Sequence, residues 1–426
     1  MANAKRSTND GQYILTAPKR LNAEIKLPAS KSLSGRALIT YALTRPASLH
    51  REVLHNVVSN LSDCDDTQVM IAALADMPEV IDIKAAGTAM RFLTAYLSVT
   101  PGTHTITGTP RMQHRPISIL VDALRELGAD VKYLGEEGFP PLRITGKTLA
   151  GGTLSLPADV SSQYISALLM IGPTLSGGLT LNLEGSIASR PYIDMTLAVM
   201  AHFGAHASWT SPSELHVGAG GYEPRPYFVE NDWSAASYWY EMMALAQDET
   251  PQVTLPGLFK ESLQGDSAIR EMFRPLGIET AFIRREDGTE TVCLSRQGKP
   301  CKHLDLDLIN QPDLAQTLIV SCAMLGVTFR FSGLASLKIK ETNRTAALQT
   351  ELRKLGVVIH EEGDSIIYWD GERQEAEADP AICTYEDHRM AMAFAPVCMR
   401  LGSIRICNPE VVSKSYPNFW TEFPCS

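Results

Sequence analysis

Four segments of the chain share one pattern of apolar and polar positions. Each has apolar residues at the spacing of an amphipathic helix, then a glycine, then a short run rich in β-branched or aromatic residues. They are residues 120–128 before 129–133, 195–204 before 205–209, 268–277 before 278–283, and 346–356 before 357–360. Glycine directly after a helix suits the left-handed turn that ends it. The pattern therefore predicts a helix and then a strand at each place.

The glycines that close these four segments are almost evenly spaced. Successive gaps of 76, 73 and 79 residues separate Gly128, Gly204, Gly277 and Gly356. Even spacing favours one helix-and-strand unit used repeatedly, with room in each for several strands and two helices. The alternative is that helix, glycine and strand follow one another by chance, as they do in many α/β proteins. Strand-like runs at 103–107 and 153–156 add to the prediction of an α/β fold.

The length of the chain predicts two domains. A chain of 426 residues exceeds what one hydrophobic core usually supports. If the repeats divide equally, two belong to each half, and residues 227–232 are a plausible crossover between them. Hydrophobic content of 44% and charged content of 20% are ordinary for a globular protein.

The net charge and the cysteines exclude several classes of function. A formal charge of −10 argues against a general binder of nucleic acid or of anionic membranes, which need a cationic surface. No two of the eight cysteines have the CxxC spacing typical of zinc sites, and Cys322 lies in an apolar run as a reduced core cysteine would. The amino terminus lacks a secretory signal, and no apolar run is long enough to span a membrane. We therefore expect a cytoplasmic protein.

Cationic and hydroxylated turns stand before several apolar helices in the N-terminal half. In residues 29–38, Ser30, Ser32 or Ser34 caps a helix, and Lys31 and Arg36 add positive charge there. A small-residue turn at 85–91, two arginines at 110–117 with a helix expected to start at Pro116, and the Ser161-Ser162-Gln163 run repeat the arrangement. Each one taken alone is compatible with an ordinary solvated helix start.

The C-terminal half has two similar turns, at 340–344 and 386–389, followed by Lys414. Asp387-His388 is also compatible with a metal site or a catalytic triad. However, no GxSxG, second nearby histidine or CxxC accompanies it. Taken together, the turns of both halves predict a concave anion site between two domains. Neither GxxxxGK[ST] nor GxGxxG occurs at a suitable place, so a nucleotide is not the obvious ligand.

Ten sequence blocks stand between about Leu27 and Phe419: LPASKSLSGRAL, AAGTAMR, PRMQHRPI, SSQYISALLM, SRPYIDMTLAVMAHFG, VENDWSAASY, NQPDLAQT, LKIKETNRTAALQTELRKLG, TYEDHRMAMAF and VSKSYPNF. In this order they resemble the signature blocks of the 5-enolpyruvylshikimate-3-phosphate synthases. The resemblance implies a two-domain, inside-out α/β barrel fold. Each domain would hold three βαβαββ units, and the active site would lie in the interdomain cleft. It places one domain at 1–28 with 232–426 and the other at 29–231.

The resemblance also implies the reaction and its residues. Enolpyruvyl would pass from phosphoenolpyruvate to the 5-hydroxyl of shikimate 3-phosphate, with release of phosphate and without a metal or other cofactor. Asp313 would take the hydroxyl proton, and Glu341 and Lys31 would move protons at the methylene carbon. Contacts to shikimate 3-phosphate would come from Lys31, Ser32, Arg36, Ser161, Ser162, Gln163, Ser189, Tyr192, Asp313 and Lys340. Contacts to phosphoenolpyruvate would come from Lys31, Gly87, Thr88, Arg115, Gln163, Arg344, Arg389 and Lys414. We expect a monomer that binds only these small molecules.

The chain departs from the family pattern in three ways. Lys84, Ala85 and Phe92 replace the usual glycine, asparagine and proline around AAGTAMR, which bears on the response to glyphosate, the family's inhibitor. The stretch between Arg36 and Gly87 is short, which predicts a trimmed strand pair in the N-terminal domain. Asn343 replaces a common aspartate, and Ser336 stands where an asparagine often contacts the shikimate phosphate.

Two alternatives remain. The related transferase that acts on UDP-N-acetylglucosamine uses a loop cysteine of its N-terminal domain. Here that half has only Cys64, in an unrelated context. The other alternative is a non-catalytic, anion-binding relative on the same scaffold, which the change at Ala85 favours.

Overall fold

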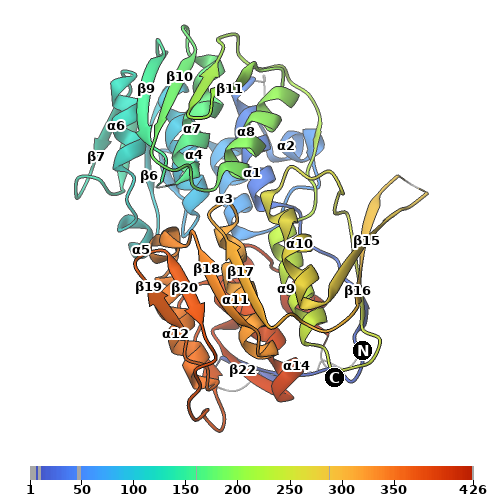
Figure 1. Cartoon of the computed structure of the whole chain (residues 1–426). Coiled ribbons are helices and arrows are strands. Elements are labelled where there is room, and N and C mark those ends of the chain that lie inside the picture. The colour runs from blue at the N-terminus through green and yellow to red at the C-terminus, as the bar shows by residue number, and fades with distance from the viewer. Residues whose placement is uncertain (1–5, 8–10, 46–48, 160, 287, 425–426) are drawn as a thin grey trace. The chain divides into compact units, whose positions relative to one another are not determined.

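The computed structural model describes residues 6–7, 11–45, 49–159, 161–286 and 288–424. The chain forms two compact units (Figure 1). Unit 1 consists of Met1–Pro28 and Asn231–Ser426, and unit 2 is Ala29–Glu230. Of the stretch expected as a crossover, Tyr227–Phe228 is still a strand of unit 2.

Five four-stranded sheets have the same strand order. In each sheet two parallel strands lie side by side, and one strand of a β-hairpin pairs antiparallel with the second of them. In unit 2 the orders are β5 (Val80–Asp82), β6 (Gly102–Thr107), β8 (Leu142–Gly146), β7 (Asp130–Tyr133), and β9 (Gly152–Pro157), β10 (Leu179–Glu184), β12 (Glu214–Val217), β11 (Ala207–Ser211). In unit 1 they are β3 (Asn22–Glu24), β14 (Gln252–Pro256), β16 (Glu290–Arg296), β15 (Ile278–Arg284); β17 (His303–Asp307), β18 (Thr328–Ser332), β20 (Ile366–Trp369), β19 (His360–Glu362); and β21 (Ala381–Ile382), β22 (Ser403–Cys407), β2 (Gln12–Thr16), β1 (Arg6–Ser7).

A sixth sheet, in unit 2, has two strands among the described residues. β13 (Tyr227–Phe228) pairs in parallel with β4 (Val58–Ser59). The helix after β4, α3 (Asp65–Asp76), is followed within four residues by β5, so the chain has no room for the hairpin that completes the other sheets. This is the trimmed strand pair that the short stretch before Gly87 predicts.

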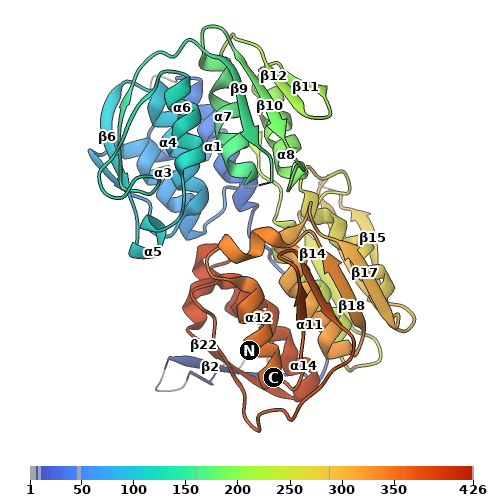
Figure 2. The same cartoon turned by 60° about the vertical axis from the view of Figure 1, so that its left-hand side comes forward.

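The helices fall into two groups by burial. Six are buried on nearly all sides, as expected for helices inside a core: α1 (Lys31–Leu43), α4 (Gly87–Val99) and α7 (Ser162–Ile171) in unit 2, and α9 (Trp233–Leu245), α11 (Ala315–Leu325) and α13 (His388–Phe394) in unit 1. In each unit these three helices pack on one another, and the sheets lie around them (Figures 1 and 2). The repeated unit therefore places its first helix inside the core and its sheet outside.

The remaining helices are more amphipathic or short. They are α2 (Arg51–Val57), α3, α5 (Pro110–Gln113), α6 (Ser118–Glu126) and α8 (Arg190–His202) in unit 2, and α10 (Ile269–Phe273), α12 (Arg344–Lys354), α14 (Cys398–Leu401) and α15 (Phe419–Glu422) in unit 1. Between them lie the 3-10 turns Gly172–Thr174, Gly265–Ala268, Arg274–Leu276, Pro312–Leu314, Ala335–Ile339, Ala395–Val397 and Pro409–Lys414. The second helix of each complete repeat belongs to this group.

The helix–glycine–strand prediction is confirmed at all four places, with shifted boundaries. The backbone is left-handed at each closing residue, with φ of 94° at Gly128, 87° at Gly204, 88° at Gly277 and 78° at Gly356. The helix predicted at 268–277 is reduced to α10, with a 3-10 turn before it and another after it. The α-helix ends at Phe273 because Pro275 has no N–H to continue the hydrogen-bond ladder. The last strand begins only at His360. The prediction that Pro116 starts a helix is wrong: α6 begins at Ser118, and Ile117 before it has φ −139°.

Candidate functional site

The polar residues selected from the sequence gather at the amino ends of the buried helices. In unit 2, Lys31 opens α1, Gly87 opens α4, and Ser161 caps α7, its hydroxyl accepting from the Gln163 amide at 3.3 Å. In unit 1, Asp313 stands just before α11 and Asp387 caps α13. These polar residues occupy equivalent positions in successive repeats, because the first helix of each repeat follows a strand and the polar residues lie at the start of that helix. The unpaired N–H groups there favour anionic ligands.

The centre of the unit 1 cluster is the carboxylate of Asp313. One oxygen accepts from Arg344 at 3.0 Å and lies 3.5 Å from the Lys340 ammonium, and the other accepts from Arg389 at 2.8 Å. Burial acts to raise the pKa of Asp313, but Arg389, Lys340 and Arg344 outweigh it and hold the pKa well below its usual value. Asp313 is therefore ionised over the whole physiological range, with 20% of its side chain exposed.

Arg344 connects this carboxylate to two others. Its side chain is 2% exposed, and it donates to Asp387 at 2.7 Å and to Glu341 at 2.9 Å as well as to Asp313. Burial lowers the pKa of Arg344, but Asp387, Glu341 and Asp313 raise it further than burial lowers it. Its guanidinium is fixed by opposite charges on three sides.

Two more residues complete the unit 1 cluster. Lys414 donates to the second oxygen of Glu341 at 2.9 Å. Arg389 contacts the hydroxyl of Tyr238 at 3.4 Å, and burial raises the pKa of that phenol to about 12 despite the arginine. Four cations, Lys340, Arg344, Arg389 and Lys414, thus surround the carboxylates of the cluster, and the buried Asp266 is close enough to interact with Asp313 and Arg389.

In unit 2, Lys31 forms an ion pair with a residue that the sequence did not single out. Its ammonium lies 3.1 Å from Asp66, whose side chain is 6% exposed in the first turn of α3. Lys31 itself is 19% exposed. Asp66 therefore holds the lysine in place while leaving part of the ammonium accessible.

Arg36 is buried beneath the end of α1 and is 2% exposed. Its guanidinium donates to Thr196 at 2.7 Å, to the carbonyl of Ser32 at 3.0 Å, and to Ser166 and the carbonyl of Tyr192 at 3.1 Å each. Burial lowers its pKa to about 10, with Tyr192 and Tyr227 opposing the shift. Arg36 thus ties together two residues expected at the site, Ser32 and Tyr192.

Gly87 and Arg115 are in direct contact. A methyl group on Gly87 would lie 2.5 Å from an Nη atom of Arg115, so the arginine fills the space that a side chain would take. The Nε of Arg115 is buried without a hydrogen-bond partner among the described residues. Beside them, the side-chain amide of Gln163 donates to the Thr88 hydroxyl at 3.2 Å. The structure thus brings together four of the residues expected near phosphoenolpyruvate.

The remaining expected residues of unit 2 are polar groups of low exposure. Ser162 is 8% exposed, and Ser189, which stands before α8, is 9% exposed. Ser189 has φ 56°, a left-handed backbone that non-glycine residues adopt at some energetic cost, often near functional sites. Tyr192 lies half-buried one turn into the same helix.

The residues that depart from the family pattern differ in how exposed they are. Lys84 is 68% exposed, has φ 53°, and pairs with Asp82 at 2.5 Å. Ala85 is exposed, whereas Phe92 is fully buried in α4, 5.3 Å from the Arg36 guanidinium. Asn343, which replaces the aspartate, still caps α12 by accepting from the Ala346 amide at 3.2 Å.

Two features that favoured other functions have structural explanations. Cys64 is fully buried beside α3, where burial and Asp66 raise the pKa of its thiol, which does not suit a nucleophile on a loop. The oxygens of Asp387 accept from Arg344 and from the Arg389 amide, at 2.7 and 2.9 Å, so this residue is a counter-ion and a helix cap. The sequence missed Asp66 as a functional residue, since an acid in the first turn of a helix is common and only the fold shows its partner.

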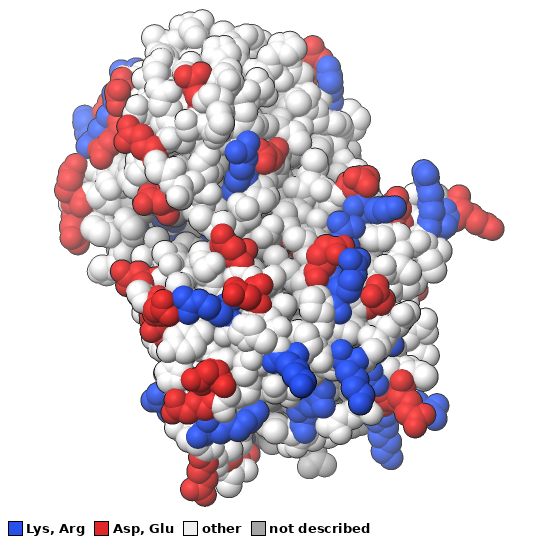
Figure 3. Space-filling model, viewed as in Figure 1, with Lys and Arg blue, Asp and Glu red and all other residues white. Residues whose placement is uncertain are grey.

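On the outer surface, acidic and basic side chains are both spread over the face shown in Figure 3. Within the described part of the chain, no helix is long and apolar enough to cross a membrane.

The chain matches one protein family over residues 75–423, described as EPSP synthase (3-phosphoshikimate 1-carboxyvinyltransferase). A 3-phosphoshikimate 1-carboxyvinyltransferase of Bacteroides fragilis (strain YCH46) is 57% identical over 412 residues, or 96% of this chain and 97% of that protein. Its counterpart in Shewanella halifaxensis is 36% identical over 440 residues, or 97% and 98%. A solved structure of EPSP synthase from Acinetobacter baumannii is similar in fold, with a TM-score of 0.73 at 22% identity over 96% of each chain.

Proposed function

Since the chain belongs to the EPSP synthase family, we infer that it is a 3-phosphoshikimate 1-carboxyvinyltransferase, a transferase of the shikimate pathway of aromatic amino-acid biosynthesis. It transfers enolpyruvyl from phosphoenolpyruvate to the 5-hydroxyl of shikimate 3-phosphate and releases phosphate. The observation in the structure that best supports this function is the Asp313 carboxylate, held by Arg344 and Arg389 and lying 3.5 Å from Lys340. A base at the centre of an anion site is what the first step requires.

Shikimate 3-phosphate would bind to unit 2. Lys31, Ser32, Ser161, Ser162 and Gln163 present an ammonium, hydroxyls and an amide at the starts of two helices, which suits a phosphate and a polyhydroxylated ring. Ser189 and Tyr192 would add to this set from α8. Arg36 is the exception, because its donors already meet protein oxygens. It would contact substrate only by exchanging one of these oxygens, and otherwise positions Ser32 and Tyr192.

Cations would hold the phosphate and the carboxylate of phosphoenolpyruvate. Arg344, Arg389 and Lys414 are the candidates in unit 1, and Lys31 and Arg115 in unit 2. The unit 1 cations are paired with Asp313, Asp387 and Glu341. An incoming anion therefore competes with carboxylates of the protein for the same donors.

This competition gives Asp313 a way to become a base when it is needed. The cations that hold its pKa low make it a poor proton acceptor as long as they stay paired with it. When the substrate anion draws Arg344 and Arg389 toward itself, the pKa of Asp313 rises, and the carboxylate can accept the 5-hydroxyl proton. Lys340, 3.5 Å away, would remain to orient it.

The remaining steps need one acid and charge neutralisation. Attack of the 5-hydroxyl oxygen on C2 of phosphoenolpyruvate is accompanied by protonation of its methylene carbon, which gives a tetrahedral adduct. Loss of a proton from the new methyl group then expels phosphate and restores the double bond. Glu341, held by Arg344 and Lys414, and Lys31, held by Asp66, are the groups proposed for these two transfers.

Several finer assignments are proposals of the same kind. We propose that each unit is the inside-out barrel of the family, which the buried helices and outer sheets support. The residue roles at Gly87, Thr88 and Gln163 rest on their contacts with Arg115 and with one another. A cytoplasmic monomer that uses no cofactor is the state we propose for the active protein.

Phosphate release tests the function directly. With phosphoenolpyruvate and shikimate 3-phosphate we expect turnover, and with UDP-N-acetylglucosamine as the acceptor we expect none. The reverse preference would assign the chain to the other transferase. Tight binding of shikimate 3-phosphate without release of phosphate from phosphoenolpyruvate would show that the protein is a non-catalytic, anion-binding relative.

A further inference from the structure

Two cysteines of unit 1 stand opposite each other at the ends of neighbouring strands. β21 and β22 are parallel, with Ala381 opposite Arg405 and Ile382 opposite Ile406. The next residue of each strand is a cysteine, Cys383 and Cys407. Both isoleucines are fully buried, and successive side chains alternate between faces, so the two cysteines point together to the other face. Neighbouring strands lie about 4.8 Å apart, within the roughly 4.4–6.8 Å between Cα atoms that a disulfide can bridge.

The two thiols differ in how easily a reagent reaches them. Both are free, with Cys383 exposed and Cys407 half-buried. The Lys354 ammonium, which is paired with Glu351 at 2.8 Å, lies 3.8 Å from the Cys383 sulfur. Burial and then the adjacent Cys383 raise the pKa of the Cys407 thiol, while Lys354 opposes this. Cys383 is therefore the sulfur that reacts first, and Cys407 the one that resolves the product.

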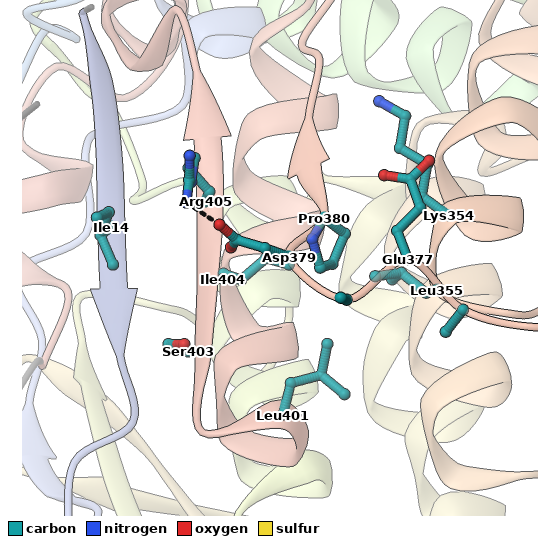
Figure 4. A pocket seen from close by; sticks show the side chains of 12 residues that line it. Ile14, Lys354, Leu355, Glu377, Asp379, Pro380, Leu401, Ser403, Ile404 and Arg405 are labelled. Carbon is teal, nitrogen blue, oxygen red and sulfur yellow. Dashed lines mark hydrogen bonds and ion pairs between the residues drawn. The ribbon is translucent and has the colours of Figure 1, made fainter.

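A surface pocket of about 450 Å³ lies along β22 and the residues just before β21 (Figure 4). Lys354 lines it on one side, and Ser403 and Arg405 line it from the same face of β22 that carries Cys407. Arg405 is paired with Asp379 across the pocket (Figure 4).

The exposed cysteine is also close in the chain to the phosphate-binding candidates. Cys383 donates its amide to Glu351 at 3.0 Å, and the Tyr385 hydroxyl donates to the same carboxylate at 2.6 Å. Tyr385 and Glu386 then have φ of 54° and 56°, a strained turn that leads into Asp387, the cap of α13. A shift of Cys383 toward β22 pulls on a turn that has little freedom to absorb it.

We propose that Cys383 and Cys407 form a reversible disulfide that regulates the Asp313–Arg344–Arg389 cluster through the turn at 384–387. The oxidant is a small-molecule disulfide. The Cys383 thiolate attacks one of its sulfurs and releases one thiolate, and the Cys407 sulfur then attacks Cys383 and releases the second. Two electrons pass from the two cysteines to the reagent, and the two protein protons end on the released thiols. Exposed disulfides of this kind are the labile ones in reducing compartments.

Mapping the bridge tests the chemical half of the proposal. Reduced protein is treated with oxidised glutathione, and peptides are analysed by mass spectrometry without reduction. We expect one cross-linked peptide pair containing Cys383 and Cys407, with loss of two hydrogen atoms, which dithiothreitol reverses. Cys407→Ser should accumulate a glutathione adduct on Cys383, and Cys383→Ser should give no bridge. A stable glutathione adduct on Cys383 of the unaltered protein, or no reaction there, would overturn the proposal.

Kinetics test the regulatory half, which rests on the proposed function. We expect the bridged protein to lose about tenfold or more in kcat/KM for phosphoenolpyruvate, since a displacement of about 1 Å at a substrate-holding group can cost roughly 100-fold. Dithiothreitol should restore it. Cys301→Ser, which changes a half-buried thiol outside the pair, should respond like the parent, and Cys383→Ser should not respond. If the disulfide forms completely and the kinetics do not change, the proposed regulation is wrong. If the unaltered protein is inactive even when reduced, the proposed function is wrong, and the peptide map still shows whether the disulfide forms.

Discussion

Arg344 in unit 1 and Arg36 in unit 2 carry the same charge at nearly the same burial, 1% and 2% exposed, yet they are held in opposite ways. Arg344 donates to three carboxylates. Arg36 donates to neutral oxygens, two hydroxyls and two carbonyls, and its guanidinium lies over the rings of Phe92 and Tyr192. Their pKa values shift accordingly, upward for Arg344 and down to about 10 for Arg36.

The difference separates two ways of building an anion site. In unit 1 the cations are neutralised largely by the protein itself, so a ligand has to replace carboxylates that are already bound. In unit 2 the supporting partners of Arg36 are hydroxyls and carbonyls, which carry no opposing charge, while Lys31 is paired with Asp66 and stays partly exposed. Unit 1 thus couples ligand binding to a change in its own carboxylates, whereas unit 2 provides a more fixed surface.

The largest effect should come from removing the central carboxylate of unit 1. Asp313→Asn keeps the shape and loses the base, and we expect kcat to fall by roughly 100- to 10,000-fold. KM for phosphoenolpyruvate should rise little or fall, because Arg344 and Arg389 lose a competing anion. Steady-state kinetics on both substrates measure this. Asp305→Asn, an exposed carboxylate on β17, is the control and should behave like the parent. A change confined to KM would make Asp313 an organiser of charge and not a base.

The two arginines themselves provide the most direct test of the comparison. Arg344→Met leaves three carboxylates without their shared cation, and we expect it to cost about 3–5 kcal/mol of unfolding free energy. Arg36→Met leaves only neutral groups without a donor, at about 1–3 kcal/mol. Urea unfolding of both variants measures the difference. Equal losses would show that burial, and not the partner's charge, decides the cost.

Two aspartates of unit 1 should respond to pH with opposite sign. Asp266 is buried, accepts from Ser234, and has its pKa raised to about 6 by burial and then by Asp313. Between about pH 4 and 6 the folded protein binds the proton that the unfolded chain has already lost, so raising the pH destabilises the fold. The pKa of Asp313 is lowered, so its contribution is present above its unfolded pKa and is lost as the pH falls through the lower folded pKa.

Asp266→Asn should therefore gain stability relative to the parent as the pH rises from about 4 to 7, by about 3 kcal/mol at most. Asp313→Asn should do the reverse and lose more at pH 7 than in acid. Urea midpoints at several pH values give both slopes. If the urea midpoints of the two variants changed with pH in the same direction, the two aspartates would not lie in electrostatically distinct surroundings.

The sequence predicted the repeat because its glycines mark a left-handed turn that few other residues tolerate, as at Gly204 and Gly356. It also predicted which turns carry charge, since a cation before an apolar helix is visible without a fold. Counter-ions were harder, because Lys31 and Asp66 are 35 residues apart and lie on different helices. For the same reason the sequence could not show that Arg36 is enclosed while Lys31 is partly accessible, although both stand in one turn and a half of α1.

The smallest effect should come from the fixed surface of unit 2. A methyl group at Gly87 would lie 2.5 Å from Arg115, but the atom that it meets is the mobile end of a long side chain, and the backbone of Gly87 does not have a positive φ. We therefore expect Gly87→Ala to change the free energy of unfolding by no more than about 0.5 kcal/mol. Arg115 must move aside, and we expect KM for phosphoenolpyruvate to rise roughly 10-fold, since about 1.4 kcal/mol of binding corresponds to that factor.

Gly35→Ala is the matched control, because a methyl group there meets the Met70 side chain at an ordinary 3.4 Å. If the two variants had the same kinetics, Arg115 would have no part in holding this substrate, and its contact with Gly87 would be packing alone.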